Sequence, residues 1–210
     1  MLKLYYAPNA CSLASHIALE EAGAEFEAVR IDMKMGEQRR AEYLAINPKG
    51  RVPALVTDRG VLTESPVILG YVAETHPQAN LAPVDDRFAF AQMQAFNLYL
   101  TATVHVTFAH AFRAERYADD EAAQAAMKAK VPQALDEQFA MIEARFQDGR
   151  PFVHGQTYTV SDAYLFVFTR WLINRGFGTP SKVPAVVTHH DRVGERPATQ
   201  RVLAREAAPA

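Results

Sequence analysis

The secondary-structure signals change once along this 210-residue chain, and that change limits the fold more than any other feature. Residues 1–80 alternate short runs of β-type residues with helical stretches, whereas the chain after residue 84 shows helical periodicity and almost no strand signal. Between them, residues 76–83 contain Pro77 and Pro83 and read as a short linker. The sequence therefore predicts two domains, residues 1–80 (α/β) and residues 84–210 (all-α).

The first domain is expected to contain a mixed four-stranded sheet. The predicted strands are residues 2–6, 25–32, 54–57 and 61–63, and the predicted helices are residues 12–22, 39–46 and one beginning at residue 65. Asp58-Arg59-Gly60 predicts a hairpin between the last two strands. Ser65 before Pro66 predicts an N-cap and a first helical residue. The order βαβ, helix, ββα favours a sheet with helices packed on it.

The second domain is expected to contain several helices, the longest over residues 86–112. The apolar stripe of that helix is Phe90, Met93, Leu98, Thr101, His105, Phe108 and Phe112. A second helix covers residues 119–146, where Pro132 should kink or divide it. A third begins at Thr159, with Asp162 completing a capping box, and its apolar body predicts the buried central helix. Arg196-Pro197 begins the last helix.

Charge and composition exclude several classes of partner. The formal net charge of -2 gives no reason to expect nucleic acid or an anionic membrane. No apolar run approaches the ~18 residues of a membrane span, and no signal peptide is apparent. A single cysteine permits no internal disulfide, so we expect a cytoplasmic protein. The histidine spacings, such as His105 with His110, predict no metal site.

Cys11 lies where the first strand gives way to a helix, which is a position that suits a reactive thiol. The unpaired N–H groups at a helix start stabilise a thiolate, so we expect a pKa below the ordinary ~8.5. The alternative is a small buried hydrophobe, because free cysteine is among the most buried residue types.

A second group of signals lies about fifty residues further on. If Val52–Pro53 is cis, the backbone of Val52 can pair with an extended peptide as an added strand, whereas an ordinary trans proline would only open an edge strand. Glu64 can pair with an ammonium, and the helix start at Ser65 suits a carboxylate, although Ser65 could merely cap and Glu64 be solvated. Together with Cys11, these features describe a site for glutathione.

Five segments resemble the bacterial beta-class glutathione S-transferases. They are residues 7–13 (APNACSL), 47–55 (NPKGRVPAL), 63–65 (TES), 159–165 (TVSDAYL) and 195–203 (ERPATQRVL). The resemblance implies a thioredoxin-like N-terminal domain with a cis proline at Pro53, an all-helical C-terminal domain and a homodimer. It also implies an enzyme that binds glutathione as a thiolate and conjugates it to small, mostly hydrophobic electrophiles, with glutathione as co-substrate and no metal.

The resemblance also implies roles for particular residues. The glutathione-binding residues would be Cys11, Lys34, Val52, Pro53, Glu64 and Ser65. The catalytic residues would be Cys11, His105 and Ser12, with Tyr5 and Tyr6 as rival partners of the thiol. The electrophile pocket would contain Leu98, Phe108 and Phe112. His105 on an apolar stripe could equally be a buried structural histidine.

This sequence departs from the family pattern at three places. Asn9 replaces the usual glycine of the turn, Val106 replaces a lysine, and Leu98 stands where the family has an asparagine. Contacts to glutathione across a dimer interface are therefore in question. Two other functions stay open at this point. One is thiol–disulfide exchange through Cys11, and the other is non-catalytic binding of glutathione or hydrophobic ligands.

Overall fold

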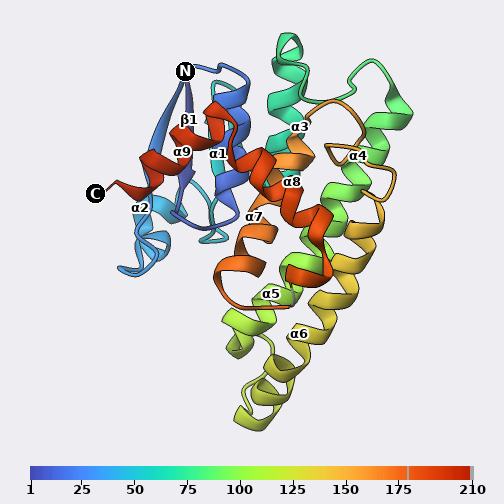
Figure 1. The fold of residues 1–210 in the computed structure, drawn as a ribbon. Helices are drawn as coiled ribbons and strands as arrows, with labels where there is room; N and C mark the ends of the chain where they lie inside the picture. The colour runs from blue at the N-terminus through green and yellow to red at the C-terminus, as the bar shows by residue number, and fades with distance from the viewer. Residues whose placement is uncertain (179, 209–210) are drawn as a thin grey trace.

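The computed structural model describes residues 1–178 and 180–208, and its first part contains the expected mixed sheet. Strand β1 (Leu2–Tyr6) runs parallel to β2 (Phe26–Arg30) and antiparallel to β3 (Ala54–Thr57). Strand β4 (Gly60–Thr63) forms the hairpin with β3, which gives the order β2-β1-β3-β4. The predicted fold class, an α/β domain followed by helices, is confirmed (Figure 1).

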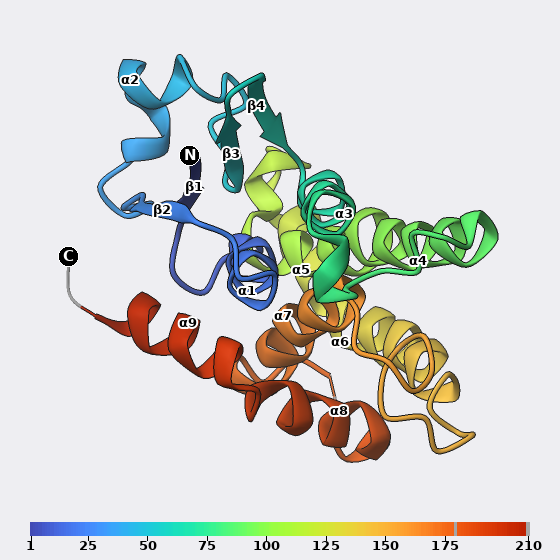
Figure 2. The ribbon, with the colours of Figure 1, turned by 90° about the horizontal axis from the view of Figure 1, so that it is seen from above.

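Helices cover both faces of this sheet. Helices α1 (Ser12–Glu21) and α3 (Ser65–Thr75) pack together on one face, and the short α2 (Ala41–Leu44) lies on the other (Figure 2). The core between the sheet and α1 and α3 is closed by fully buried aliphatic side chains, among them Leu4, Ile17, Leu55 and Ile68. Burial of this apolar surface is the main force that holds the layers together.

The start of α3 differs by one residue from the prediction that Ser65 is its N-cap. The N-cap is Glu64, which has φ 71°, and Ser65 is the first helical residue. Strand β4 continues to Thr63, so the chain must turn from strand to helix within one residue, and Glu64 makes that turn in the left-handed region. Ser65 is therefore part of the first turn of α3, and its side chain is not the cap of this helix.

The second part is helical. Helices α4 (Arg87–Tyr99) and α5 (His105–Phe112) form one run, joined by a π-helical turn over residues 100–104. Asp86 caps this run by accepting hydrogen bonds from the N–H groups of Phe88 and Ala89, each at 3.0 Å. Helix α6 (Glu121–Ala144) continues through Pro132 and is not divided. No helix of residues 1–178 and 180–208 is long and apolar enough to cross a membrane.

Helix α7 (Val160–Asn174) is the buried central helix, as predicted, and packs against α1 and α8 (Pro184–Gly194). The capping box of Thr159 and Asp162 is present. The fully buried carboxylate of Asp162 accepts hydrogen bonds from the N–H groups of Thr159 (2.7 Å) and Val153 (2.8 Å), and lies 2.8 Å from His189 Nε2. Asp162 therefore joins three segments of the helical part.

Helix α9 (Pro197–Ala207) returns the chain to the sheet domain and packs on α1 (Figures 1 and 2). Its start at Pro197 confirms the predicted signal Arg196-Pro197. Glu206, 6% exposed, places one carboxylate oxygen 3.0 Å from His16 Nδ1. Its other carboxylate oxygen accepts a hydrogen bond from the N–H of Asn9 at 3.3 Å. The last helix thus supports the turn that precedes Cys11.

Candidate active site

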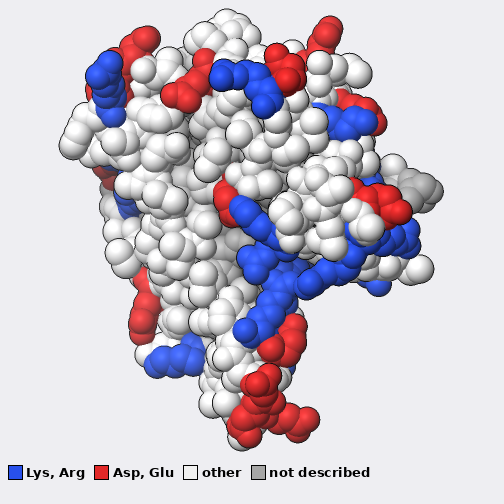
Figure 3. Space-filling model, turned by 180° about the vertical axis from the view of Figure 1, so that it is seen from behind, with Lys and Arg blue, Asp and Glu red and all other residues white. Residues whose placement is uncertain are grey.

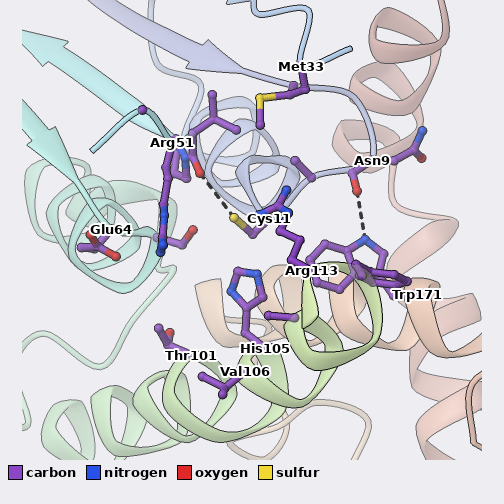
Figure 4. Close-up of a pocket in the computed structure, with 18 of the residues that line it drawn as sticks. Asn9, Cys11, Met33, Arg51, Glu64, Thr101, His105, Val106, Arg113 and Trp171 are labelled. Atoms are coloured by element: carbon purple, nitrogen blue, oxygen red, sulfur yellow. Dashed lines mark hydrogen bonds between the residues drawn. The ribbon is translucent and has the colours of Figure 1, made fainter. Parts of the chain in front are cut away.

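A cavity of about 500 Å³ lies between the sheet domain and the helical part (Figure 4). The sheet domain contributes the turn after β1, the residues around Pro53 and the start of α3. The helical part contributes α5, the turn that follows it and the end of α7. Of the predicted site residues, the lining contains Cys11, Val52, Pro53, Glu64, Ser65, His105 and Phe112.

The turn before Cys11 is held from the helical part. Asn9 has φ 59°, a conformation that asparagine tolerates better than most residues, so the departure from glycine is accommodated. The indole N–H of Trp171 donates to the carbonyl of Asn9 at 2.9 Å, and Glu206 accepts from its N–H. The position of Cys11 therefore depends on residues that are far away in the sequence.

Cys11 is the N-cap residue of α1, and its thiol donates to the carbonyl of Val52 with an S···O distance of 3.4 Å. Burial raises the pKa of the Cys11 thiol above its ordinary value, although Ser65 and the charge of Arg113 act in the opposite direction. The prediction of a lowered pKa is therefore wrong. The loss of hydration outweighs the helix N-terminus, because desolvation disfavours the charged form of a thiol.

Ser12 does not face the cavity. Its side chain is fully buried, donates to the carbonyl of Ala7 at 3.2 Å and accepts from the N–H of Ala7 at 3.1 Å. Both hydrogen bonds close the turn between β1 and α1. The prediction that Ser12 could activate glutathione is therefore at odds with its position, and Tyr5 and Tyr6 likewise lie outside the lining.

The Val52–Pro53 peptide bond is cis, as the resemblance implied. The carbonyl of Val52 accepts the thiol of Cys11. Its N–H donates to no acceptor among residues 1–178 and 180–208. An extended peptide in the cavity could therefore pair with this N–H, which is what a strand-addition site requires.

Glu64 and Ser65 lie together at the start of α3 and both line the cavity. The Glu64 carboxylate pairs with Lys49 at 2.5 Å, and Lys49 also donates to the Thr63 hydroxyl at 2.8 Å. Lys34, expected to bind glutathione, is exposed and outside the lining, and Met33 lines the cavity in its place. The loop after β2 turns the Lys34 side chain to solvent while Asp32 holds its backbone N–H at 2.8 Å.

His105 projects from α5 toward Cys11 (Figure 4) and lies 5.5 Å from the ring of Phe168 and 5.4 Å from that of Trp171, centroid to centroid. Burial lowers the pKa of His105 to about 4, and the charges of Arg113 and Arg51 act in the same direction. The imidazole is therefore neutral near pH 7 and has one N–H to donate.

Two of the residues expected in the electrophile pocket are elsewhere. Phe112 lines the cavity, but Phe108 is fully buried behind it, with ring centroids 6.1 Å apart. Leu98 is 56% exposed and outside the lining. The π-helical turn after Tyr99 adds a residue to the helix, so one 3.6-residue repeat does not describe both of its halves. Leu98 also lies off the buried face of α4 itself, because it follows the buried Met93 by five residues.

Sequence reasoning missed the cationic wall of the cavity. Arg51, Arg113, Arg116 and Arg175 all line it, together with Trp171, Tyr164 and Tyr117. Two signals were available, because Arg113 and Arg116 follow the long helix at a spacing of three residues and Arg175 directly follows the buried central helix.

Two family models match most of the chain. The model described as "Glutathione S-transferase, N-terminal domain" matches residues 1–74, and "Glutathione S-transferase, C-terminal domain" matches residues 99–197. The chain is 34% identical over 208 residues to the glutathione S-transferase GstA of Escherichia coli O157:H7, with 98% of each protein covered.

Solved structures of similar proteins cover nearly the whole chain. A glutathione transferase homologue from Sulfitobacter with bound glutathione superposes with a TM-score of 0.92 at 37% identity, covering 99% of both chains. A beta-class glutathione S-transferase of Sphingomonas chungbukensis gives a TM-score of 0.84 at 32% identity, covering 98% of both. These similarities agree with the resemblance that the sequence motifs indicated.

Proposed function

This chain belongs to the glutathione S-transferase family, and we propose that it conjugates glutathione to small electrophiles in the cavity between its sheet domain and its helices. One observation supports this proposal above the others. The free N–H of Val52, the start of α3 at Glu64 and Ser65, and the pair Cys11 and His105 all border the same cavity. These groups match the backbone, the α-amino acid end and the sulfur of glutathione.

Glutathione would lie extended along the edge of the cavity. Its backbone would pair with the N–H of Val52, and its γ-glutamyl carboxylate would accept from Ser65 and the N-terminus of α3. Its ammonium would approach Glu64, which Lys49 now occupies at 2.5 Å. Lys49 would then move away or bind a second carboxylate of glutathione.

The chemistry needs a thiolate held beside the electrophile. The glutathione sulfur would sit near Cys11, where the thiol of Cys11, the neutral His105 and the charge of Arg113 stabilise negative charge. The sulfur would form a bond to the electrophilic carbon, and the leaving group would depart with the bonding electrons. Positioning and thiolate formation would both lower the barrier.

The other two functions have less support. A Cys11 whose thiol pKa is raised by burial is a poor nucleophile for thiol–disulfide exchange. A protein that only carried hydrophobic ligands would not need the polar groups that surround Cys11. Location in the cytoplasm is part of this proposal and depends on the single cysteine of the chain.

Initial rates with glutathione and 1-chloro-2,4-dinitrobenzene test the function. We expect saturable conjugation, and Ser65→Ala should raise the KM for glutathione about tenfold, because a hydrogen bond to a carboxylate is lost. Ser181→Ala is the matched control, because Ser181 is exposed and outside the cavity. A rate no higher than the uncatalysed reaction at millimolar glutathione would refute the proposal.

We also propose a homodimer, with α3 and α4 at the interface. These neighbouring helices expose Val67 (50%), Phe88 (73%) and Leu98 (56%) to solvent. Sedimentation should give twice the 23.3 kDa chain mass, and Phe88→Asp should weaken the dimer because it places a charge in an apolar contact. Met35→Asp, at another exposed apolar residue (68%), is the control and should stay dimeric. A monomeric wild-type chain at micromolar concentration would contradict the proposal.

A further inference from the structure

The cavity is strongly cationic although the chain as a whole has a formal net charge of -2. Arg51, Arg113, Arg116 and Arg175 line it, while Glu64 is its only acidic lining residue in the described part of the chain. Glu64 is itself paired with Lys49. Figure 3 shows Lys and Arg side chains gathered in a band across one face of the molecule. A cavity with this charge raises the local concentration of anions.

None of these four guanidinium groups forms an ion pair with a carboxylate within residues 1–178 and 180–208, and the only carboxylate whose charge acts on Arg116 is that of its chain neighbour Glu115. Other arginines of the chain do: Arg150 pairs with Asp148, Arg196 with Glu21 and Arg201 with Glu20. Arg175 instead lies over the ring of Phe112, 4.5 Å from its centroid. Arginines without partners at a cavity are available for a ligand, and their planar donors suit carboxylates.

Two of the four arginines border Cys11, and their charges also act on the third, Arg116. Arg51 and Arg113 lie on either side of Cys11, above His105 (Figure 4), and therefore border the place of the glutathione sulfur. Arg116 follows α5, and Arg175 follows α7 with its guanidinium on Phe112. The wall that holds Arg116 and Arg175 thus combines positive charge with aromatic surface.

We propose that the electrophile preferred by this site has a carboxylate next to an aromatic or apolar reactive part, and that Arg116 and Arg175 bind this carboxylate. The inference rests on the proposed transferase function and names its substrate class. In the proposed binding mode of glutathione, its γ-glutamyl end lies at Glu64 and Ser65 and its second carboxylate lies near Lys49, whereas Arg116 and Arg175 stand on the opposite, helical wall. The rim charges would also steer the acid to the cavity.

The probe reaction is aromatic substitution on 4-chloro-3-nitrobenzoate. The glutathione sulfur forms a C–S bond at the carbon that bears chlorine, the C–Cl bond breaks, and chloride leaves with the bonding pair. The thiol proton goes to solvent. The matched neutral probe is 4-chloro-3-nitrobenzamide, which has the same shape without the charge. Each kcat/KM is divided by the rate constant of the uncatalysed reaction with glutathione, because the two rings differ in reactivity.

We expect this ratio to be about tenfold higher for the acid than for the amide, and the preference to shrink as salt is added. Arg116→Gln and Arg175→Gln should each lower the preference severalfold, and Arg116→Lys should restore part of it. The amide rate of each variant reports whether the protein is still folded. Arg59→Gln is the control, since Arg59 is exposed in the β3–β4 turn and outside the cavity.

Three outcomes would overturn the inference: equal ratios for acid and amide, equal losses on both probes in the arginine variants, or an effect confined to the KM for glutathione. If 1-chloro-2,4-dinitrobenzene is not conjugated either, it is the transferase function that fails. The arginines are then tested by calorimetry, where 3-nitrobenzoate should bind more tightly than 3-nitrobenzamide, and equal affinities would overturn their assignment.

Discussion

Two opposing effects act on the thiol pKa of Cys11, and the effect of burial is the larger. A position at the start of α1 favours the thiolate, and so do Ser65 and Arg113. Cys11 is half-buried at the cavity wall, however, and desolvation is the largest influence on its pKa. The thiol therefore stays protonated near pH 7 and serves as a hydrogen-bond donor, now to the carbonyl of Val52.

We expect iodoacetamide to alkylate Cys11 slowly at neutral pH. Because the thiolate is the nucleophile and burial raises the thiol pKa, the rate should still be rising above pH ~8.5, where a free thiol is half ionised. Mass spectrometry of the alkylated protein over a pH series measures this rate, with N-acetylcysteine as the reference thiol. A rate that levels off near neutrality would mean that the helix start dominates after all.

At the scale of single elements, Asp162 is the side chain on which the helical part most depends. Its carboxylate is fully buried and accepts from Thr159, Val153 and His189, so its removal leaves several buried donors without an acceptor. Asp162→Ala should lower the free energy of unfolding by about 3–5 kcal/mol. Urea unfolding followed by circular dichroism measures this change.

The control for Asp162 is Asp120→Ala. Asp120 caps α6 by accepting from the N–H of Ala123 at 2.7 Å, but it is exposed, so its loss should cost about 1 kcal/mol. A cost for Asp162→Ala no greater than that for Asp120→Ala would show that the buried network contributes little beyond an ordinary cap.

The elements that the sequence predicted well have local causes. The β3–β4 hairpin, the capping box before α7 and the proline that begins α9 each depend on a few adjacent residues. The π-helical turn after Tyr99 has no such signature, and Leu98, five residues after the buried Met93, lies on another face of α4. Glu64 as the N-cap of α3 was missed because the left-handed turn there depends on where β4 ends.

The part of the site that was predicted from the sequence also has local causes. The sheet-domain residues Cys11, Val52, Glu64 and Ser65 belong to short motifs, and the structure brings them to one cavity. The helical wall is formed by side chains that only the tertiary fold brings there, so its arginines were not expected. Ser12 and Phe108 were predicted to belong to the site, and each lies one residue or one turn from a lining residue. Both side chains nevertheless point into the core and are fully buried.

At the scale of the whole molecule, the two parts position one site between them. Helix α1 packs on the sheet domain's α3 and on α7 and α9 of the helical part. The indole of Trp171 and the carboxylate of Glu206 hold Asn9, two residues before Cys11. Because the same contacts connect the two parts and shape the turn, a change that loosens their packing should also displace Cys11.

Three partly buried histidines make the stability of the whole chain depend on pH. Burial is the main cause that lowers the pKa of His105, His154 and His190 to about 4 each. In the unfolded chain these groups bind protons with the ordinary pKa of about 6.5. Between these two values the unfolded state binds more protons than the folded state, so stability is fully present above pH ~6.5 and is lost as the pH falls toward 4.

We therefore expect the urea midpoint to fall steadily from about pH 7 to about pH 5, by at most roughly 2 kcal/mol of unfolding free energy per histidine. Asp148 does not contribute to a loss in this window, since Arg150 lowers its pKa to about 2 and that group stays ionised throughout. His190→Phe tests the cause, because phenylalanine can keep the stacking on Phe166, where ring centroids are 4.5 Å apart. The variant should lose less stability than the wild type over the same pH range, and an unchanged slope would assign the pH dependence to other groups.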